Sequence, residues 1–275
     1  GVCMWLLARR VSPGFAGRSA VLYCTSYYLV VTAVGRFAAA ELLVMAFLPL
    51  LILYYVRLLG SEGKLLDVGL TILIALGWLT DVPAALAVFY VLLIGALGYA
   101  IARRSVCPVL VYLLAQGVGV GLAAWYLAPA LLARGQLAVS SLEREYPWKS
   151  YTLFHQPAYL IRPTLTYPLW AWSIAGAGLI VYWYWRQRDA EEVGGRSREL
   201  RLAVLLGCVP ILFQVPVSGL LWEHLPELRA VAFSFRFLPF LGIGLSLIVP
   251  IMSRDALRRR ILYGCWILLM CLPVG

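Results

Sequence analysis

The stretch VGRFAAAELLVMAFLPLLILYYVRL, residues 34–58, decides the fold class, because it contains an apolar run from Ala40 to Leu58. A helix that spans a membrane needs about 20 mostly apolar residues, and this run has that length and composition. Arg36 and Glu41 stand at the start of the run, and Arg57 stands at its end. The stretch therefore predicts a spanning helix with ionisable residues at its entrance.

Seven further apolar runs follow the same pattern along the chain. Apolar residues make up 63% of the sequence and charged residues only 13%, with a mean hydropathy of +0.86, which places the chain in lipid. With partial runs at both ends, the sequence predicts an all-α polytopic membrane protein: one transmembrane domain over residues 1–275, a bundle of about 8–10 spans. Several runs are short, which favours tilted, re-entrant or broken helices. The seven runs are Ala20–Val34, Leu65–Leu79, Ala84–Ala102, Val106–Leu127, Tyr167–Trp185, Leu202–Leu221 and Phe237–Ile251.

The distribution of Lys and Arg predicts the orientation, because basic residues of short loops stay on the cytoplasmic side. A single alternation of crossings places all the strongly basic loops inside, so the net charge of +10 indicates topology and not nucleic-acid binding. The outer loops then lie near residues 35–41, 80–83, 128–166 and 222–236. The basic residues that fall outside are Arg36, Arg134, Arg144, Lys149, Arg162, Arg229 and Arg236.

The chain ends and the cysteines set further expectations. Gly1 in place of Met, with incomplete apolar runs at both ends, indicates an internal fragment of a longer protein; a processed N-terminus is the alternative. The six cysteines lie in or beside apolar runs, and no Cys-x-x-Cys spacing occurs, so we expect packing roles and no disulfide framework.

Arg36 and Glu41 are the first candidate site residues, because ionisable groups at the membrane boundary are costly unless they are paired or hydrated. On a continuous helix the two side chains would not share a face. They meet if the chain turns near Gly35, which would put Glu41 near a helix N-terminus. A binding role and an ion pair that fixes the turn are both open.

Asp81, in the sequence LTDVP, is the second candidate. It precedes a helix with Pro83 near its first turn, so a capping role alone would explain it. It is also the carboxylate of that short outer turn, which favours a functional role.

Arg236, in the sequence FSFRFLP, is the third candidate. An arginine there can extend its head group to the membrane interface, or its planar fork can hold the phosphate of a lipid-linked substrate.

The outer loops supply the remaining candidates, which are Glu143, His224 and Glu227. The spacing of the two histidines indicates no metal site, so we predict no residue to be a metal ligand. Whether the protein needs a divalent metal ion stays open.

Several short motifs together resemble a known group of membrane proteins. The sequence is similar to the 6-pyruvoyl-tetrahydropterin synthase-related membrane proteins, near the YfhO-like proteins of the GT-C glycosyltransferase superfamily. The motifs that carry the resemblance are Tyr27-Tyr28, Gly35-Arg36, Glu41-Leu42-Leu43, Pro49-Leu50, Leu79-Thr80-Asp81-Val82-Pro83, Ala128-Pro129-Ala130-Leu131 and Phe233-Ser234-Phe235-Arg236-Phe237-Leu238.

The resemblance implies a GT-C-like bundle whose outer loops hold a polyprenyl-phosphate-linked sugar and an acceptor. Arg36 and Arg236, with His224 and Glu227, would bind substrate, and Asp81, Glu41 or Glu143 would act in catalysis. The chain departs from the family pattern at Asp81, where such proteins often have His, and at Ser234-Phe235, where Pro-Trp is usual. The acidic residues of the family's first outer loop would lie upstream of Gly1.

These expectations give the leading hypothesis and its rivals. The leading hypothesis is a multi-pass glycosyltransferase, or part of one, in a prokaryotic cytoplasmic membrane, with membrane lipids and the lipid-linked donor as partners. A transporter or flippase of lipid-linked or hydrophobic solutes is the alternative, although no internal repeat is visible and mid-span polar residues are few. A non-catalytic scaffold is the third hypothesis, and it is favoured if the outer charged residues are paired with one another and buried from any cavity.

Overall fold

The computed structural model describes residues 1–61, 64–133, 163–187, 195–231, 233–253 and 263–264. Within these ranges the chain is helical and has no strand, so the protein is an all-α polytopic membrane protein. The helices are α1 (Val2–Val11), η1 (Pro13–Phe15), α2 (Ala16–Cys24), α3 (Tyr27–Val30), η2 (Val31–Gly35), α4 (Ala39–Gly60), α5 (Val68–Thr80), α6 (Val82–Arg103), α7 (Cys107–Leu132), α9 (Pro163–Gln187), α10 (Gly195–Leu206), α11 (Val209–Leu212), η5 (Pro216–Ser218), α12 (Gly219–His224), α13 (Pro226–Val231), η6 (Ser234–Phe237) and α14 (Pro239–Met252).

Four helical segments of the described chain are long and apolar enough to cross a membrane, and a bent pair makes a fifth. The four are Ala39–Gly60, Val82–Arg103, Cys107–Leu132 and Ser234–Met252, and the bent pair joins Glu199–Leu212 to Pro216–His224 at 79°. This is fewer than the eight predicted runs.

Local sequence explains the difference. The run Ala20–Val34 is divided between α2, α3 and the π-helical turn η2. The run Leu65–Leu79 forms the 13-residue α5, because Asp67 caps that helix by accepting a hydrogen bond from the Leu70 amide at 3.0 Å. The run Tyr167–Trp185 lies within the 25-residue α9, which is rich in Tyr and Trp and is not among the four. The prediction of broken helices is thus confirmed at the run Ala20–Val34 and at the bent pair that covers the run Leu202–Leu221.

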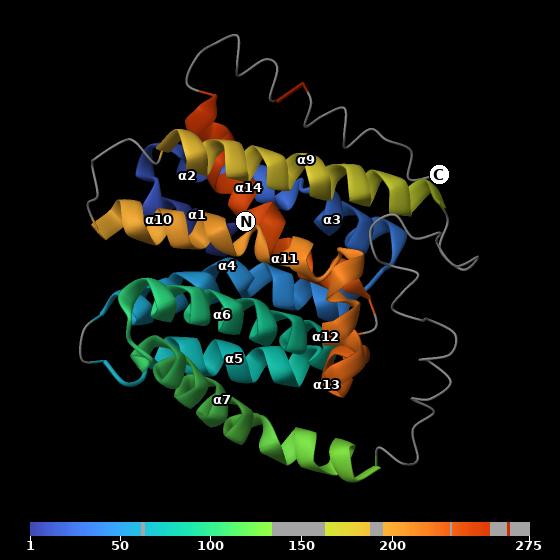
Figure 1. The fold of residues 1–275 in the computed structure, drawn as a ribbon. Helices are drawn as coiled ribbons and strands as arrows, with labels where there is room; N and C mark the ends of the chain where they lie inside the picture. Colours follow the sequence, from blue (N-terminus) through green and yellow to red (C-terminus); the bar gives the residue numbers. More distant parts are fainter. Residues whose placement is uncertain (62–63, 134–162, 188–194, 232, 254–262, 265–275) are drawn as a thin grey trace.

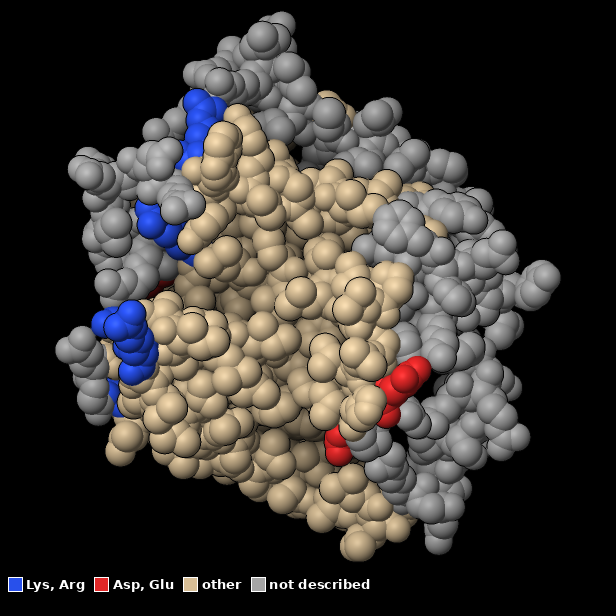
Figure 2. Space-filling view, viewed as in Figure 1, with Lys and Arg blue, Asp and Glu red and all other residues tan. Residues whose placement is uncertain are grey.

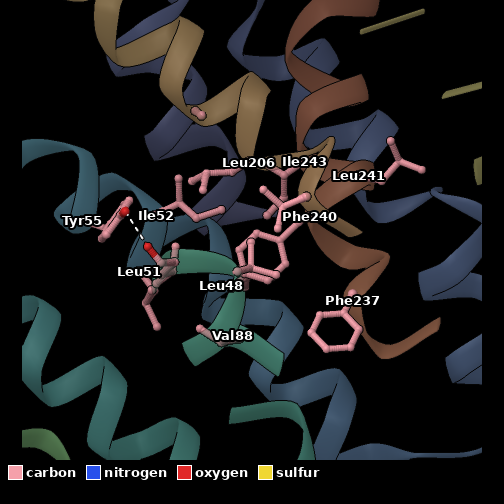
Figure 3. Packing of buried hydrophobic residues seen from close by; sticks show 14 of the residues in the cluster. Leu48, Leu51, Ile52, Tyr55, Val88, Leu206, Phe237, Phe240, Leu241 and Ile243 are labelled. Carbon is pink, nitrogen blue, oxygen red and sulfur yellow. Dashed lines mark hydrogen bonds between the residues drawn. The ribbon is translucent and has the colours of Figure 1, made fainter. Parts of the chain in front are cut away.

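The long helices lie roughly side by side, with α4 in the middle of the bundle (Figure 1). Contacts of α4 reach α1, α5, α6, α7 and α10, and α14 packs against α2, α9 and α10. In Figure 3, Leu48 and Ile52 of α4 lie close to Phe240 and Ile243 of α14 and to Leu206 of α10. These side chains are fully or almost fully buried, so apolar packing between distant segments forms the core.

Charge divides the two ends of the bundle. In Figure 2 the visible Lys and Arg side chains lie at the left edge of the molecule, and most of the visible Asp and Glu surface lies toward the right. The last turns of α1, α4, α6 and α9 carry basic residues, and we call the end where they gather the basic end. The opposite end, with Glu41, Asp81, Glu223 and Glu227, is the acidic end. This division agrees with the predicted alternation of crossings.

Candidate functional site

A chain reversal builds the first part of the candidate site at the acidic end. The π-helical turn η2 ends at Gly35, and Phe37 has a positive φ of 52° before α4 begins at Ala39. Single π turns often occur at functional sites, and a non-glycine residue in this conformation is unusual. The reversal brings Arg36 back against Glu41 in the first turn of α4, as the sequence predicted for a turn near Gly35.

Arg36 and Glu41 form an ion pair with two hydrogen bonds. Arg36 Nη1 donates to Glu41 Oε1 at 3.1 Å, and Nη2 donates to Oε2 at 2.9 Å. The Tyr28 hydroxyl donates to Glu41 Oε1 and accepts from Arg36 Nη1 at 3.3 Å. The Glu41 side chain is only 2% exposed, so its carboxylate contacts protein groups and has almost no contact with solvent or lipid.

Arg236 joins this cluster from the other end of the sequence. Its Nε lies 3.6 Å from Glu41 Oε2, and its Nη1 donates to the Val231 carbonyl at 2.8 Å. Nε itself is buried and has no hydrogen-bond partner among the described residues, since 3.6 Å is too long for a hydrogen bond. One buried carboxylate therefore holds two guanidinium groups that come from distant segments.

Aromatic rings enclose the two arginines. Phe233 and Phe235 stack at a centroid distance of 4.9 Å, and the Arg36 guanidinium lies 4.9 Å from the centroid of the Phe235 ring. The Arg236 guanidinium lies 5.2 Å from the Phe233 ring. Such contacts with ring faces stabilise a cation in a site that water reaches poorly.

Asp81 lies beside this cluster, in the turn between α5 and α6. It is the N-cap of α6, where Oδ1 accepts a hydrogen bond from the Ala84 amide at 3.2 Å, so the predicted capping role is confirmed. Asp81 also interacts electrostatically with Arg236, Glu41 and Arg36. Burial raises the pKa of Asp81 above its ordinary value, and the nearby Arg236 opposes that rise. We call Arg36, Glu41, Asp81 and Arg236 the charged cluster.

The other predicted site residues lie elsewhere. His224 is the last residue of α12, it is exposed, and its Nδ1 is 2.8 Å from the Leu220 carbonyl oxygen. Glu227 is exposed in the first turn of α13. In the part of the chain that the structure describes, no hydrogen bond or ion pair joins either residue to the charged cluster. Glu143 lies outside the described residues, and no group of three or more His, Cys, Asp or Glu suited to a metal ion occurs within them.

The sequence did not identify Tyr28 or the two phenylalanines as parts of the site. Tyr28 appears in the motif Tyr27-Tyr28, but its contact with Glu41 depends on the break between α2 and α3. Nor did the sequence indicate that Arg36 and Arg236 share one carboxylate, because 200 positions separate them in the chain. Their common position beside short aromatic motifs at helix entrances was the available signal.

No protein-family model matches this sequence, and no curated protein matches it either. The GT-C resemblance therefore stays a prediction.

Proposed function

We propose that this chain is a GT-C-like membrane glycosyltransferase, or part of one, that takes sugar from a polyprenyl-phosphate donor at the extracytoplasmic face of a prokaryotic cytoplasmic membrane. The observation that carries the proposal is the pairing of Arg36 and Arg236 on the buried Glu41, beside the half-buried Asp81. A site with two arginines and a separate acid at the membrane boundary suits a phosphate leaving group and an acceptor hydroxyl.

The two arginines would bind the donor phosphate. A guanidinium has five N–H donors, and the Glu41, Tyr28 and Val231 contacts use only part of the ten that Arg36 and Arg236 provide. Planar guanidinium groups match phosphate oxygens with paired hydrogen bonds. Glu41 and the phenylalanine rings would hold both groups ready, which lowers the cost of ordering them on binding.

Asp81 would act as the general base, and Glu41 as a positioning residue. Glu41 is enclosed by its three partners, whereas Asp81 uses one oxygen for the Ala84 amide and is partly exposed. A carboxylate whose pKa is raised by burial is a stronger base toward a hydroxyl than an ordinary Asp. This division of roles assigns different functions to two of the three carboxylates that the sequence placed in catalysis; the third, Glu143, lies outside the described residues.

The proposed step transfers the sugar in one displacement. The acceptor oxygen forms a bond to the anomeric carbon, the bond from that carbon to the phosphate oxygen breaks, and Asp81 takes the hydroxyl proton. Arg36 and Arg236 neutralise the charge on the departing polyprenyl phosphate.

Two alternatives are each favoured by one observation. The bent pair Glu199–Leu212 and Pro216–His224 has the broken-span geometry that transporters use at their binding sites, which favours a transporter or flippase. The enclosure of Glu41 by Arg36, Arg236 and Tyr28 leaves its side chain only 2% exposed, and a carboxylate that is paired and buried in this way favours a non-catalytic scaffold.

Replacing Asp81 and Arg236 separately tests the proposal, with turnover of lipid-linked sugar as the readout. We expect Asp81→Asn to lower turnover by about 10²–10⁴-fold at unchanged expression, and Arg236→Gln to lower it as well. Glu199→Gln, whose ion-pair partner Arg10 lies at the basic end, serves as the control. Unchanged turnover in both variants would remove the mechanism. Solute flux in proteoliposomes that contain no acceptor would identify a transporter if the flux is lost in the same variants. Absence of both sugar turnover and solute flux in the wild type would favour the scaffold.

A further inference from the structure

A cleft at the basic end has a separate chemistry from the charged cluster. It has a volume of about 350 Å³ and lies where α4 ends, α6 ends and α7 begins. Its polar lining includes Lys64, Tyr99 and Arg103, and its apolar wall includes Leu58, Leu59 and Val111. Cationic and apolar surfaces thus meet in one hollow at the end of the bundle.

The two cations come from different segments of the chain. Arg103 is in the last turn of α6, and its Nε donates to the Tyr99 hydroxyl at 3.2 Å while its guanidinium lies 5.5 Å from the Tyr99 ring centroid. These contacts orient the arginine along the cleft wall. Lys64 reaches the same cleft from the connection between α4 and α5, and its side chain is exposed.

Backbone donors at the start of α7 contribute less. The Cys107 amide donates to Ser105 Oγ at 3.3 Å, the Val109 and Leu110 amides donate to the Val106 carbonyl, and Pro108 has no N–H. Recognition of an anion in this cleft therefore depends on the side chains of Lys64 and Arg103.

We propose that this cleft binds a phosphate group, with an anionic membrane lipid as its source. Arg and Lys side chains are the groups that hold phosphate oxygens, and a cleft of this size accommodates a small ligand. Basic pockets between spanning helices on the cytoplasmic side are suited to acidic lipid head groups. Leu65, in the lining of the cleft, has an exposed apolar side chain that a lipid chain can contact. Free phosphate shares the head-group chemistry but gains nothing from that contact.

Cys107 provides a direct probe, because its thiol is free, exposed and part of the cleft lining. The purified chain in phosphate-free detergent is alkylated with a maleimide, and modification of Cys107 is followed by peptide mass spectrometry. Phosphatidylglycerol in the micelles is expected to slow alkylation of Cys107. Inorganic phosphate at the same concentration is expected to slow it much less.

Matched variants separate the cleft from general surface charge. Lys64→Gln with Arg103→Gln is expected to weaken protection by about tenfold or more, because two charge-assisted contacts are lost. Arg9→Gln with Arg57→Gln removes the same charge from the basic end but from outside the cleft lining, and is expected to preserve protection. If the loss of Arg103 disturbs folding, Lys64→Gln alone is the test variant, because the Lys64 side chain is exposed and its replacement should leave the fold intact. This variant is also expected to weaken protection.

The outcomes decide both the site and its ligand. Equal protection by inorganic phosphate and by the lipid keeps the phosphate site and assigns it to the free ion. Protection that survives Lys64→Gln with Arg103→Gln, or no protection by either phosphate source, overturns the proposal. Because the readout uses no transferase activity, its failure is distinct from failure of the proposed function.

Discussion

Arg36 and Glu41 face each other across the reversal between η2 and α4, with Nη1–Oε1 and Nη2–Oε2 distances of 3.1 and 2.9 Å. Five positions along a continuous helix would turn the two side chains away from each other. The ion pair therefore exists because the π-helical turn ends at Gly35 and Phe37 adopts a positive φ. The same reversal points both groups toward Arg236, which makes Glu41 the centre of the charged cluster.

Glu41→Gln is expected to destabilise the protein by about 3–5 kcal/mol, because it leaves two partly buried guanidinium groups beside a neutral amide. Thermal unfolding in detergent measures the loss. Glu199→Gln is the matched control: it breaks the more exposed Arg10–Glu199 pair at 2.9 Å and is expected to cost about 0.2–1 kcal/mol. Similar losses in the two variants would show that burial adds nothing to the Glu41 contacts.

Asp81→Ala is expected to cost about 1 kcal/mol through loss of the α6 cap, whereas Asp81→Asn keeps an acceptor for the Ala84 amide and is expected to cost less. Unfolding of both variants at one pH checks this order. A larger loss in Asp81→Asn than in Asp81→Ala would mean that the cap contributes little.

The pH dependence of stability follows from the raised pKa of Asp81, whose cause is burial. Because the folded-state pKa lies above the ordinary value of 3.8, Asp81 contributes stability below that value and loses it as pH rises through the folded-state pKa. We therefore expect the wild type to lose stability relative to Asp81→Asn over that window. A difference between the two proteins that stays constant from acidic to neutral pH would contradict the assignment.

Gly119→Ala is expected to destabilise the contact between α5 and α7 by about 1–3 kcal/mol. A Cβ at Gly119 would lie 2.5 Å from Ile74 Cγ2 and 3.1 Å from the Thr71 carbonyl oxygen, and the backbone atom cannot move aside easily. A Cβ at Gly121, two residues further along α7, would meet nothing within 4 Å. Gly121→Ala is thus the control, and its thermal unfolding temperature is expected to equal or slightly exceed that of the wild type.

The two ends of α7 are expected to label from opposite sides of the membrane. Cys107 is exposed at the basic end, and Leu132, at the other end of the helix, is 89% exposed. A membrane-impermeant maleimide should modify Cys107 from the cytoplasmic side and a Leu132→Cys variant from the outside, with sites located by peptide mass spectrometry. Modification of both from one side would mean that α7 does not span, and the reverse pattern would place the charged cluster in the cytoplasm.

Much of the site was visible in the sequence because its residues stand beside local signals. Asp81 precedes Pro83 at a helix start, so its capping role followed from the sequence. The turn at Gly35 allowed Arg36 and Glu41 to be paired as a conditional expectation. Tyr28 was missed as a partner of Glu41, because its position depends on how α3 leaves α2.

Apolar run length and loop charge are local properties, so the amino-acid sequence alone was enough to predict a helical membrane protein with its basic residues gathered at one end. The position of Arg36 and Arg236 on one carboxylate, Glu41, and the cleft that Lys64 and Arg103 line, depend on the packing of the helices. Those relationships join segments far apart in the chain, and they arise from how the apolar faces of α4, α6 and α14 pack. No residue pattern within a single run encodes that packing.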